Sequence, residues 1–590
     1  MPFAKATPGL LLVAMFNLLW STVEAQSTLT VPSQFPTIQS AINAANNGDQ
    51  VVVAPGVYAE TLDFNGKIIV VRSLTGATTT SIDAQGLGTA VRFVSGEPRA
   101  SRLEGFTIRG GLGSSVMPPV PEFAAPGGVL VIGSAPTIRE CFIEFNVGGA
   151  GIASAGPTAM AGGAGAIGSF GNSFALFQNC KIRNNTGGVG GDIIVPTGMI
   201  PSGQAGTGGA GAVVSVFANV GIADCELEDN QGGDGGAGAG LALGGNGGSG
   251  AVDVFGGQPA VGNSKLIANT GGNAGVAPAG AGAAGTGGVF VNPSALFAIV
   301  NCFVTQNVAG SGPINAALTG GIRKDGTAGQ HPPIQVLHCT VADNSAGMSA
   351  IATGGIHGLA ELRNTIVYGN GAGVELGGAI SVVTYCNIED GYPGVNNINA
   401  NPLFKDSSQR DYHLLTSSPC RERGNAGFAS FLDVDIDNDP RAVNGVADIG
   451  ADEICLEGTN EDFVMVSSVN GIGDPFRCVK GAVAGDVVVF GWISPAATFI
   501  GADVVLLAQF HNAASLPIQS PILHPSIHLI ASQTALIQST GMLPAGGDFF
   551  MVNALAVPPG TTARVQAIVL SNIAANGIFA SSRAHDIIHL

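Results

Sequence analysis

A six-residue pattern recurs through the middle of this chain. It consists of a Cys, a variable residue, an aliphatic residue, two more variable residues and an Asn. Successive copies start 37 to 45 residues apart from position 141 to position 339, and the last copies are 22 to 25 residues apart. The copies begin at Cys141, Cys180, Cys225, Ser264, Cys302 and Cys339, with looser copies at Asn364 and Cys386. One such unit cannot bury its own apolar face, so the copies must stack.

Within each repeat, the residue pattern predicts strands. Residues alternate with a period of two, as in Cys141-Phe142-Ile143-Glu144, and helical spacing is absent. A second element, a Gly-rich start that runs into aliphatic residues, precedes most copies, as at 287–291. Each repeat therefore predicts two or three short strands. Stacked copies predict an all-β fold, a right-handed parallel β-helix with one coil per repeat.

Stacking also predicts three columns of side chains. The Cys and the aliphatic residue two positions later would form an inward ladder. The Asn would mark the bend after the strand, because Asn tolerates the left-handed conformation and can hydrogen-bond along its own stack. The outward residues would alternate in charge between coils about 4.8 Å apart. Those outward residues are Lys181, Glu226 and Lys265 in one column, and Glu144, Arg183 and Glu228 in the next.

Composition explains what the long repeats contain besides strands. Gly accounts for 90 of 590 residues, and charged residues for 11%, against about 25% in an average protein. A minimal coil needs about 20 to 25 residues. The excess falls in Gly-rich segments that we expect to bulge from one side as mobile surface loops. These segments are 148–165, 187–211, 232–250 and 271–288.

The two ends of the stack are also recognisable. Ile38, Ala41, Ile42 and Ala45 share one helical face after Thr37, which predicts a short capping helix over the first coil. Strands are expected at 50–53 and 68–72, with a Pro-Gly turn between them. After residue 455 the repeat stops, and strand-like runs separated by turns predict a β-sandwich over 456–590.

The first 25 residues have the features of a secretory signal peptide. Lys5 precedes an apolar run from Leu10 to Trp20, and Val23-Glu24-Ala25 supplies the small residues of a cleavage site before Gln26. The run is shorter than the ~20 residues of a membrane span. We therefore expect a secreted or cell-surface protein with no transmembrane segment in the mature chain, and a β-helix over 26–455.

Three segments carry resemblances to known families. Residues 31–72, with Thr37 to Ile42 and Pro55 to Tyr58, look like the opening of pectate-lyase-like and pectinesterase-like β-helix proteins. The repeats resemble those of bacterial surface proteins with polymorphic outer-membrane repeats. Residues 401–453, which end in Asp448-Ile-Gly-Ala-Asp-Glu453, resemble the closing, choice-of-anchor-type module of secreted bacterial β-helix proteins. The resemblances imply fold and location, and no catalytic residue.

Cysteines and carboxylates are the candidate residues for disulfides and metal sites. Six of the nine Cys fall on or near the ladder and would act as small hydrophobes. Cys455 and Cys478 could pair, Cys420 would stay free, and the absence of a CxxC pair argues against zinc. The run Asp433, Asp435, Asp437 and Asp439 could hold calcium. It lacks the Gly and Glu of an EF-hand loop, so a solvated charged edge is favoured, and no cofactor is assigned.

Candidate catalytic residues are few. Lys181, Arg183, Glu226 and Glu228 are the residue types of a pectate-lyase site, but a salt-bridge ladder explains them equally well and is favoured. His357 lies in Gly-Ile-His-Gly, which is not the polygalacturonase motif, and the pectinesterase signature is missing. Catalytic residues thus remain unknown, and no metal site is predicted.

The function predicted from the sequence is a non-catalytic, structural, adhesive or glycan-binding role at the cell surface. The alternative is a polysaccharide lyase or glycoside hydrolase. A β-solenoid ice binder would need a flat Thr array, which is missing. Polysaccharides or cell-envelope components are the expected partners, while the net charge of −18 argues against nucleic acid. Clustered carboxylates with a base would indicate an enzyme, and mutually paired charges a scaffold.

Overall fold

The structure is a computed structural model that describes residues 26–589, with several gaps. The gaps are 118–119, 121, 196–201, 313–317, 348–351, 372, 416, 429–433, 438, 440, 442–445, 455–461, 472–478, 513–535, 554–560, 576–577 and 583. The predicted signal peptide, Cys455 and Cys478 lie outside the described residues. Within the described part of the chain, no helix combines the length and the apolar character that a membrane span requires.

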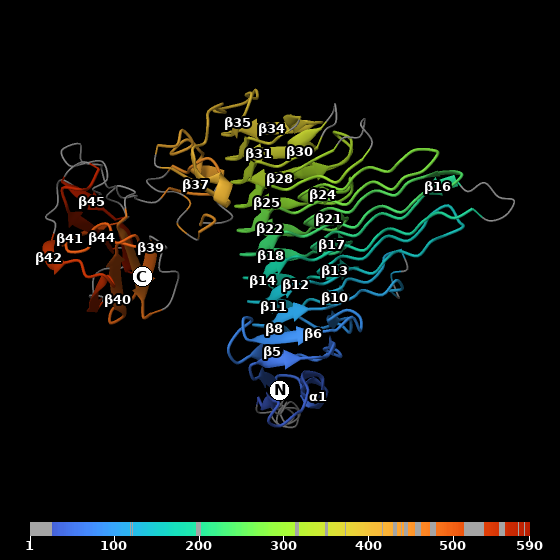
Figure 1. Cartoon of the computed structure of the whole chain (residues 1–590), viewed down its shortest axis with the longest axis horizontal. Coiled ribbons are helices and arrows are strands. Elements are labelled where there is room, and N and C mark those ends of the chain that lie inside the picture. Colours follow the sequence, from blue (N-terminus) through green and yellow to red (C-terminus); the bar gives the residue numbers. More distant parts are fainter. Residues whose placement is uncertain are drawn as a thin grey trace, which may run out of the picture.

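Three long parallel sheets form the main body (Figure 1). Sheet 1 has twelve strands: β1 (Thr28–Val31), β2 (Gln50–Val53), β5 (Val70–Ser73), β8 (Arg102–Glu104), β11 (Thr137–Arg139), β14 (Leu176–Gln178), β18 (Gly221–Ala223), β22 (Ala260–Gly262), β25 (Ala298–Val300), β28 (Ile334–Leu337), β31 (Ala360–Arg363) and β34 (Ile380–Thr384).

Sheet 2 has eleven strands and carries the six-residue pattern: β3 (Gly56–Tyr58), β6 (Thr80–Asp83), β9 (Thr107–Arg109), β12 (Phe142–Glu144), β15 (Lys181–Arg183), β19 (Glu226–Glu228), β23 (Lys265–Ile267), β26 (Phe303–Thr305), β29 (Thr340–Ala342), β32 (Ile366–Tyr368) and β35 (Asn387–Ile388). Sheet 3 has ten: β4 (Leu62–Asp63), β7 (Val91–Phe93), β10 (Val129–Ile132), β13 (Ile167–Phe170), β17 (Val213–Val216), β21 (Val252–Phe255), β24 (Val289–Val291), β27 (Ile322–Lys324), β30 (Thr353–Gly358) and β33 (Val374–Gly377).

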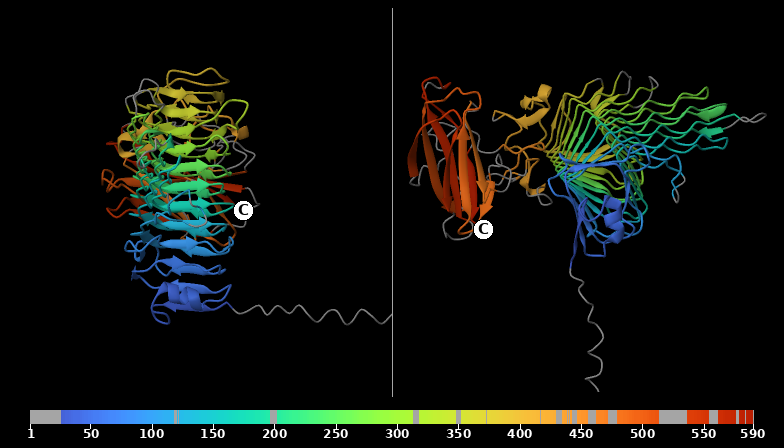
Figure 2. Two further views of the ribbon diagram at one scale, coloured as in Figure 1. Left: turned by 90° about the vertical axis from the view of Figure 1, so that its right-hand side faces the viewer. Right: turned by 60° about the horizontal axis from the view of Figure 1, so that its bottom comes forward.

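The register confirms one coil per repeat. Ile143 pairs with Ile182, which pairs with Leu227, so equivalent residues of successive repeats are neighbours. The fold is a right-handed parallel β-helix, as predicted, and Figure 2 shows its coils stacked along one axis. Helix α1 (Ile38–Ala44) lies at the N-terminal end, with the Thr37 side chain accepting a hydrogen bond from the Ser40 N–H in a capping box.

The predicted inward ladder is the core of the helix. The ladder Cys and the aliphatic residue two positions later are buried in every copy, and Ser264 takes the Cys position by accepting a hydrogen bond from the Cys225 N–H at 3.0 Å. The seven described Cys are all buried and free of disulfides. Parallel neighbours on one column pack as small apolar groups, as expected.

The Asn column forms a buried hydrogen-bonded ladder. The Asn230 side chain accepts from the Asn185 N–H (3.1 Å) and amide (3.0 Å), and it donates to Ile182 O (2.8 Å) and Asn269 Oδ1 (2.9 Å). One detail of the prediction was wrong. The left-handed residue is the one before each Asn, with φ between 52° and 57°. The chain bends at this preceding residue, because the side-chain amide of the Asn is held by hydrogen bonds along the stack. These residues are Phe145, Asn184, Asp229, Ala268, Gln306 and Asp343.

The Gly-rich segments differ most from expectation. They project together from one side of the stack as a layered extension rather than as separate loops (Figures 1 and 2). Outgoing and returning stretches interlock: Gly188 N–H donates to Gly163 O, Gly209 N–H to Gly188 O, and Gly233 N–H to Gly209 O, each at 2.8 Å. Main-chain hydrogen bonds therefore hold these segments in a regular arrangement, and the prediction that they are mobile surface loops was wrong.

The close approach of neighbouring backbones explains why these segments are glycine-rich and regularly packed. A Cβ atom on Gly209 would lie 2.0 Å from the Gly163 carbonyl oxygen, and one on Gly188 would lie 1.9 Å from the Gly149 oxygen. Only Gly lets these backbones come so close, as at the axis of collagen, and the Gly-Gly-Xaa spacing matches the three-residue turn of a polyproline II helix. A small parallel pair, β16 (Ser202–Gln204) and β20 (Leu241–Leu243), belongs to this extension.

Two further parts follow the last coil. A tail comprises β36 (Phe404–Asp406), the 3₁₀ turn η1 (Ser407–Gln409), β37 (Asp411–Leu414) and η2 (Ala426–Phe428), and continues to residue 454. The C-terminal part has one sheet of β38 (Val464–Val469), β40 (Val487–Ile493) and β43 (Asp548–Asn553), and a second of β39 (Val479–Ala482), β41 (Asp503–Asn512), β42 (Leu536–Met542), β44 (Thr561–Leu570), β45 (Phe579–Ser581) and β46 (His585–His589).

The two C-terminal sheets share one apolar core that includes Phe490, Trp492, Val504 and Val569. All strand pairs in these sheets are antiparallel except β39 with β46, which is parallel. This arrangement agrees with the predicted antiparallel sandwich apart from that one pair.

Candidate functional site

The outward face of sheet 2 carries the residues that the sequence pointed to as catalytic candidates. Register places Lys181 beside Glu226 and Arg183 beside Glu144, and their charged groups lie 2.7 Å apart in both pairs. Glu228 pairs with Arg410 of the tail. All four candidates are thus engaged in ion pairs. Pairs this exposed contribute about 0 to 1 kcal/mol to stability each.

The tail docks along the upper coils of this face. Tyr412 is buried against Phe303, and its hydroxyl donates to Asp343 at 2.8 Å. Next to it, the Asn364 amide donates to Asn425 O (2.9 Å) and accepts from the Asn425 N–H (2.8 Å). The tail therefore covers part of sheet 2 and part of the turns between sheets 1 and 2.

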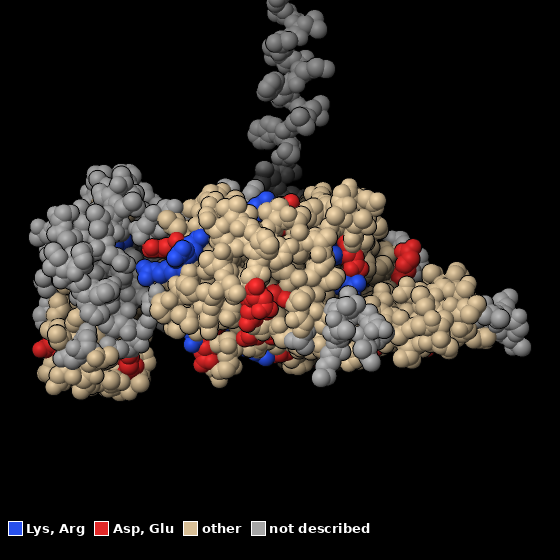
Figure 3. Space-filling view, turned by 90° about the horizontal axis from the view of Figure 1, so that it is seen from above, with Lys and Arg blue, Asp and Glu red and all other residues tan. Residues whose placement is uncertain are grey.

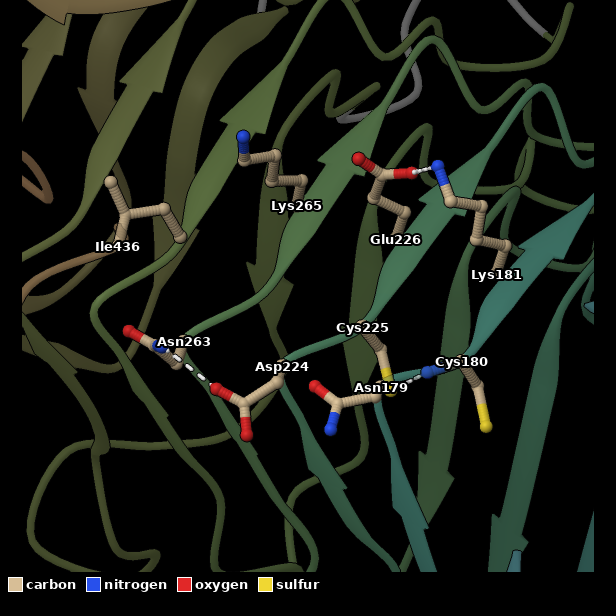
Figure 4. Close-up of a pocket in the computed structure, with 9 residues that line it drawn as sticks. All are labelled: Asn179, Cys180, Lys181, Asp224, Cys225, Glu226, Asn263, Lys265 and Ile436. Carbon is tan, nitrogen blue, oxygen red and sulfur yellow. Dashed lines mark hydrogen bonds and ion pairs between the residues drawn. The ribbon is translucent and has the colours of Figure 1, made fainter. Parts of the chain in front are cut away.

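A polar pocket of about 260 Å³ lies beside the tail (Figure 4). Its walls are two columns of side chains from three successive coils, and its upper end is Ile436 of the tail. One column comes from the turns that precede the ladder residues: Asn179, Asp224 and Asn263. The other comes from the strands of sheet 2: Lys181, Glu226 and Lys265. The Cys180 and Cys225 sulfurs point away from it, into the core (Figure 4).

The pocket holds both paired and free polar groups. Asp224 accepts from the Asn263 amide at 2.8 Å through one oxygen, and Lys181 pairs with Glu226. The Asn179 amide has no hydrogen bond to a described residue, and Lys265 pairs with no described carboxylate. The Lys265 ammonium lies 5.7 Å from the centre of the Phe303 ring. Two ammonium and two carboxylate groups make the formal charge of the pocket zero.

The acidic run was predicted to be a solvated edge, and that prediction was wrong for two of its members. Asp435 and Asp439 are buried. Asp435 accepts the N–H groups of Asp437 (2.9 Å), Asp439 (2.8 Å) and Glu453 (2.9 Å), so its carboxylate organises the backbone of the tail. Asp433 lies outside the described residues. The run is therefore largely structural, because backbone N–H groups satisfy the Asp435 carboxylate.

A second group of residues, which the sequence did not single out, lies beside this run. His413 of β37 contacts Asp437 through Nε2 at 3.0 Å and Asp411 through Nδ1 at 2.5 Å. Burial opposes a charge on the ring, but the two carboxylates outweigh burial and raise the His413 pKa to about 10. His413, Asp437 and Asp452 each offer a ligand atom within 4.8 Å of the others, as a metal site would. The protonated imidazole supplies one positive charge to this group and, as a donor at both ring nitrogens, has no lone pair to offer a metal ion.

The tail motif from Asp448 to Glu453 also has a structural role. Asp448 accepts the N–H groups of Glu422 (2.6 Å) and Ile454 (2.8 Å). Gly450 has φ +118°, and a Cβ there would lie 2.7 Å from Ile366 on β32. The motif thus fits the tail against the stack.

Two other residues noted in the sequence are also buried or half-buried. Cys420 is buried and accepts a hydrogen bond from Asn387 at 3.2 Å. His357 is half-buried on β30 beside Thr353.

Charge is sparse on the face seen from above the stack. Figure 3 shows one face on which Lys, Arg, Asp and Glu occur in a few small groups separated by wide uncharged areas. This distribution agrees with the low charged content of the sequence.

Comparison with known proteins adds little to this geometry. No family model matches the chain, and no curated protein matches it. Among solved structures, the chain is similar to a pectin methylesterase variant crystallised with a hexasaccharide, at 13% identity over 40% of this chain and 82% of that one. The TM-score of that match is 0.18, so it carries no argument, and the β-helix assignment is drawn from the strand register.

Proposed function

We propose that this chain is a non-catalytic, secreted or cell-surface β-helix that acts as a structural and adhesive scaffold and binds glycans. The observation that supports this proposal most is the pairing of charges on sheet 2: Lys181 with Glu226, Arg183 with Glu144, and Glu228 with Arg410. A general base must be free to take a proton from its substrate. Side chains held in such pairs stabilise a surface, and none of these four candidates is left as a free base.

The location and partners belong to the same proposal. The predicted signal peptide supports secretion, and the net charge of −18 makes nucleic acid an unsuitable partner. Polysaccharides or cell-envelope components suit a long, sparsely charged solenoid, because solenoids use extended surfaces for binding. Calcium is not required by the proposal.

The second candidate is a polysaccharide lyase or hydrolase, and the pocket is the observation in its favour. Lys265 has no described carboxylate partner, lies in register with Glu226 of the neighbouring coil, and lines the same pocket as Asp224. In such a site a carboxylate would take the proton from the uronide ring, and the ammonium group would stabilise the negative charge that develops on the uronate.

One panel of reactions separates the two candidates. The purified mature chain is incubated with pectate, alginate and neutral polysaccharides, with and without calcium, and unsaturated uronides and new reducing ends are measured. The proposal expects neither product. Unsaturated uronides would establish a lyase, and reducing ends alone a hydrolase. In either case, loss of the product in Lys265→Met would assign it to the pocket.

A further inference from the structure

We infer that the pocket between the two polar columns binds the terminal, neutral sugar unit of a glycan. This inference rests on the proposed glycan-binding function and names its site. It starts from how the columns are built. Asn179, Asp224 and Asn263 occupy the same turn position on three coils, with φ of 51°, 55° and 50°. Each coil therefore places a polar side chain, either an amide or a carboxylate, next to a strand residue of sheet 2, at the ~4.8 Å spacing of the stack.

The same turn column already binds polar groups in its upper coils. Asn364 holds the Asn425 main chain through both its amide donor and its acceptor, and Asn301 donates to Val434 O. The column thus binds a segment laid across it by paired hydrogen bonds. Lower on the column, the Asn179 amide and the second oxygen of Asp224 keep their hydrogen-bonding capacity, since no described residue bonds them.

The free groups match a polyol. Asp224 can accept from sugar hydroxyls, Lys265 can donate to them, and the Asn179 amide can do both. Two lysines and two carboxylates leave no net charge in the pocket. A polyanionic glycan would meet the repulsion of a chain with net charge −18, so a neutral sugar is favoured.

Size and surroundings indicate the end of a glycan chain. The volume of about 260 Å³ is below the ~300–1,000 Å³ of pockets for drug-sized ligands, and suits a single sugar ring. Ile436 closes the upper end (Figure 4). In the other direction, Phe142 pairs in register with Lys181 and is partly exposed. Its ring lies one coil below, with the Arg183 guanidinium 5.6 Å from the ring centre, and the part of the ring that Arg183 leaves exposed provides an apolar surface for the next sugar.

The test is a glycan array that holds neutral and uronic-acid oligosaccharides, followed by affinity measurements on the best ligands. The parent chain is compared with Asn179→Gly, which suits the positive φ, with Asp224→Asn, and with Glu361→Gln as a matched control in a partly exposed pair on sheet 1. Thermal melting verifies that every variant is folded. We expect Asp224→Asn to weaken binding of a neutral glycan about tenfold or more, since a hydrogen bond to a charged group is lost, and Asn179→Gly to weaken it about threefold or more, since a hydrogen bond to a neutral amide is lost. The control should bind like the parent.

Three results would overturn the inference. Equal affinity of the parent and both pocket variants would place binding elsewhere, and the proposed function would stand. Binding restricted to uronic-acid glycans would contradict the neutral ligand. No binding to any glycan would contradict both the inference and the glycan-binding function.

Discussion

Replacing Asn230 by Ala should weaken the stack measurably. Asn230 lies in the middle of the buried ladder, with 1% of its surface exposed, and its side chain takes part in four hydrogen bonds of 2.8 to 3.1 Å. A hydrogen bond contributes about 0.5–1.5 kcal/mol net. Four of them amount to about 2–6 kcal/mol, a large part of the ~5–15 kcal/mol that holds a typical domain folded.

The assay is urea unfolding together with native-state hydrogen exchange, because a solenoid can open locally. The neighbouring coils, whose Asn185 and Asn269 lose partners, should show the largest gain in exchange. Asn273→Ala is the control, since Asn273 is exposed and accepts one hydrogen bond from the Ser311 N–H. A loss below ~1 kcal/mol for Asn230→Ala, or equal losses for both variants, would refute the role assigned to the ladder.

Three other predictions test the glycine extension and the tail. Gly209→Ala should lower the melting temperature and raise hydrogen exchange between residues 149 and 250, because its Cβ would meet the Gly163 oxygen at 2.0 Å. Gly171→Ala, with open space at its Cβ, should lower the melting temperature less. Equal effects of the two variants would contradict the packing. The His413 pKa is raised from 6.5 to about 10, so its stabilisation of the tail should be complete below pH 6.5 and lost as the pH rises to 10. The melting temperatures of the parent and His413→Gln should therefore converge above pH 10; a constant difference would contradict the ion pairs. A chelator should leave the melting temperature unchanged, since protonated His413 contacts both Asp411 and Asp437 and leaves no ring lone pair for a metal ion; a drop of several degrees would indicate a bound cation instead.

The repeat made the coil architecture predictable from the sequence. The pattern of Cys180, Ile182 and Asn185 recurs in one order, with Ser264 in one Cys position and looser copies at the end, so the inward ladder, the Asn stack and the alternation of Lys181 with Glu226 all follow from one register. Local patterns such as the Thr37 cap were also predictable, because the interacting residues are close in sequence.

Contacts between distant segments were not predictable in this way. His413 meets Asp437 only because the tail folds back on itself, and Arg410 reaches Glu228 across 182 positions. The order of the glycine extension was missed for another reason. Its packing depends on main-chain hydrogen bonds and on the absence of side chains, as at Gly209, and neither produces a hydrophobic pattern. The polar pocket was missed because Asn179 and Asp224 looked like ordinary turn residues.

The central claim, that this β-helix holds glycans without cutting them, can be tested by one measurement. The mature chain is mixed with a polysaccharide that it binds on the array, and the mixture is followed over time by size-exclusion chromatography with light scattering. We predict that protein and polysaccharide co-elute and that the molar mass of the polysaccharide stays constant. A falling molar mass would contradict the non-catalytic role, and elution of the two as separate species would contradict the binding.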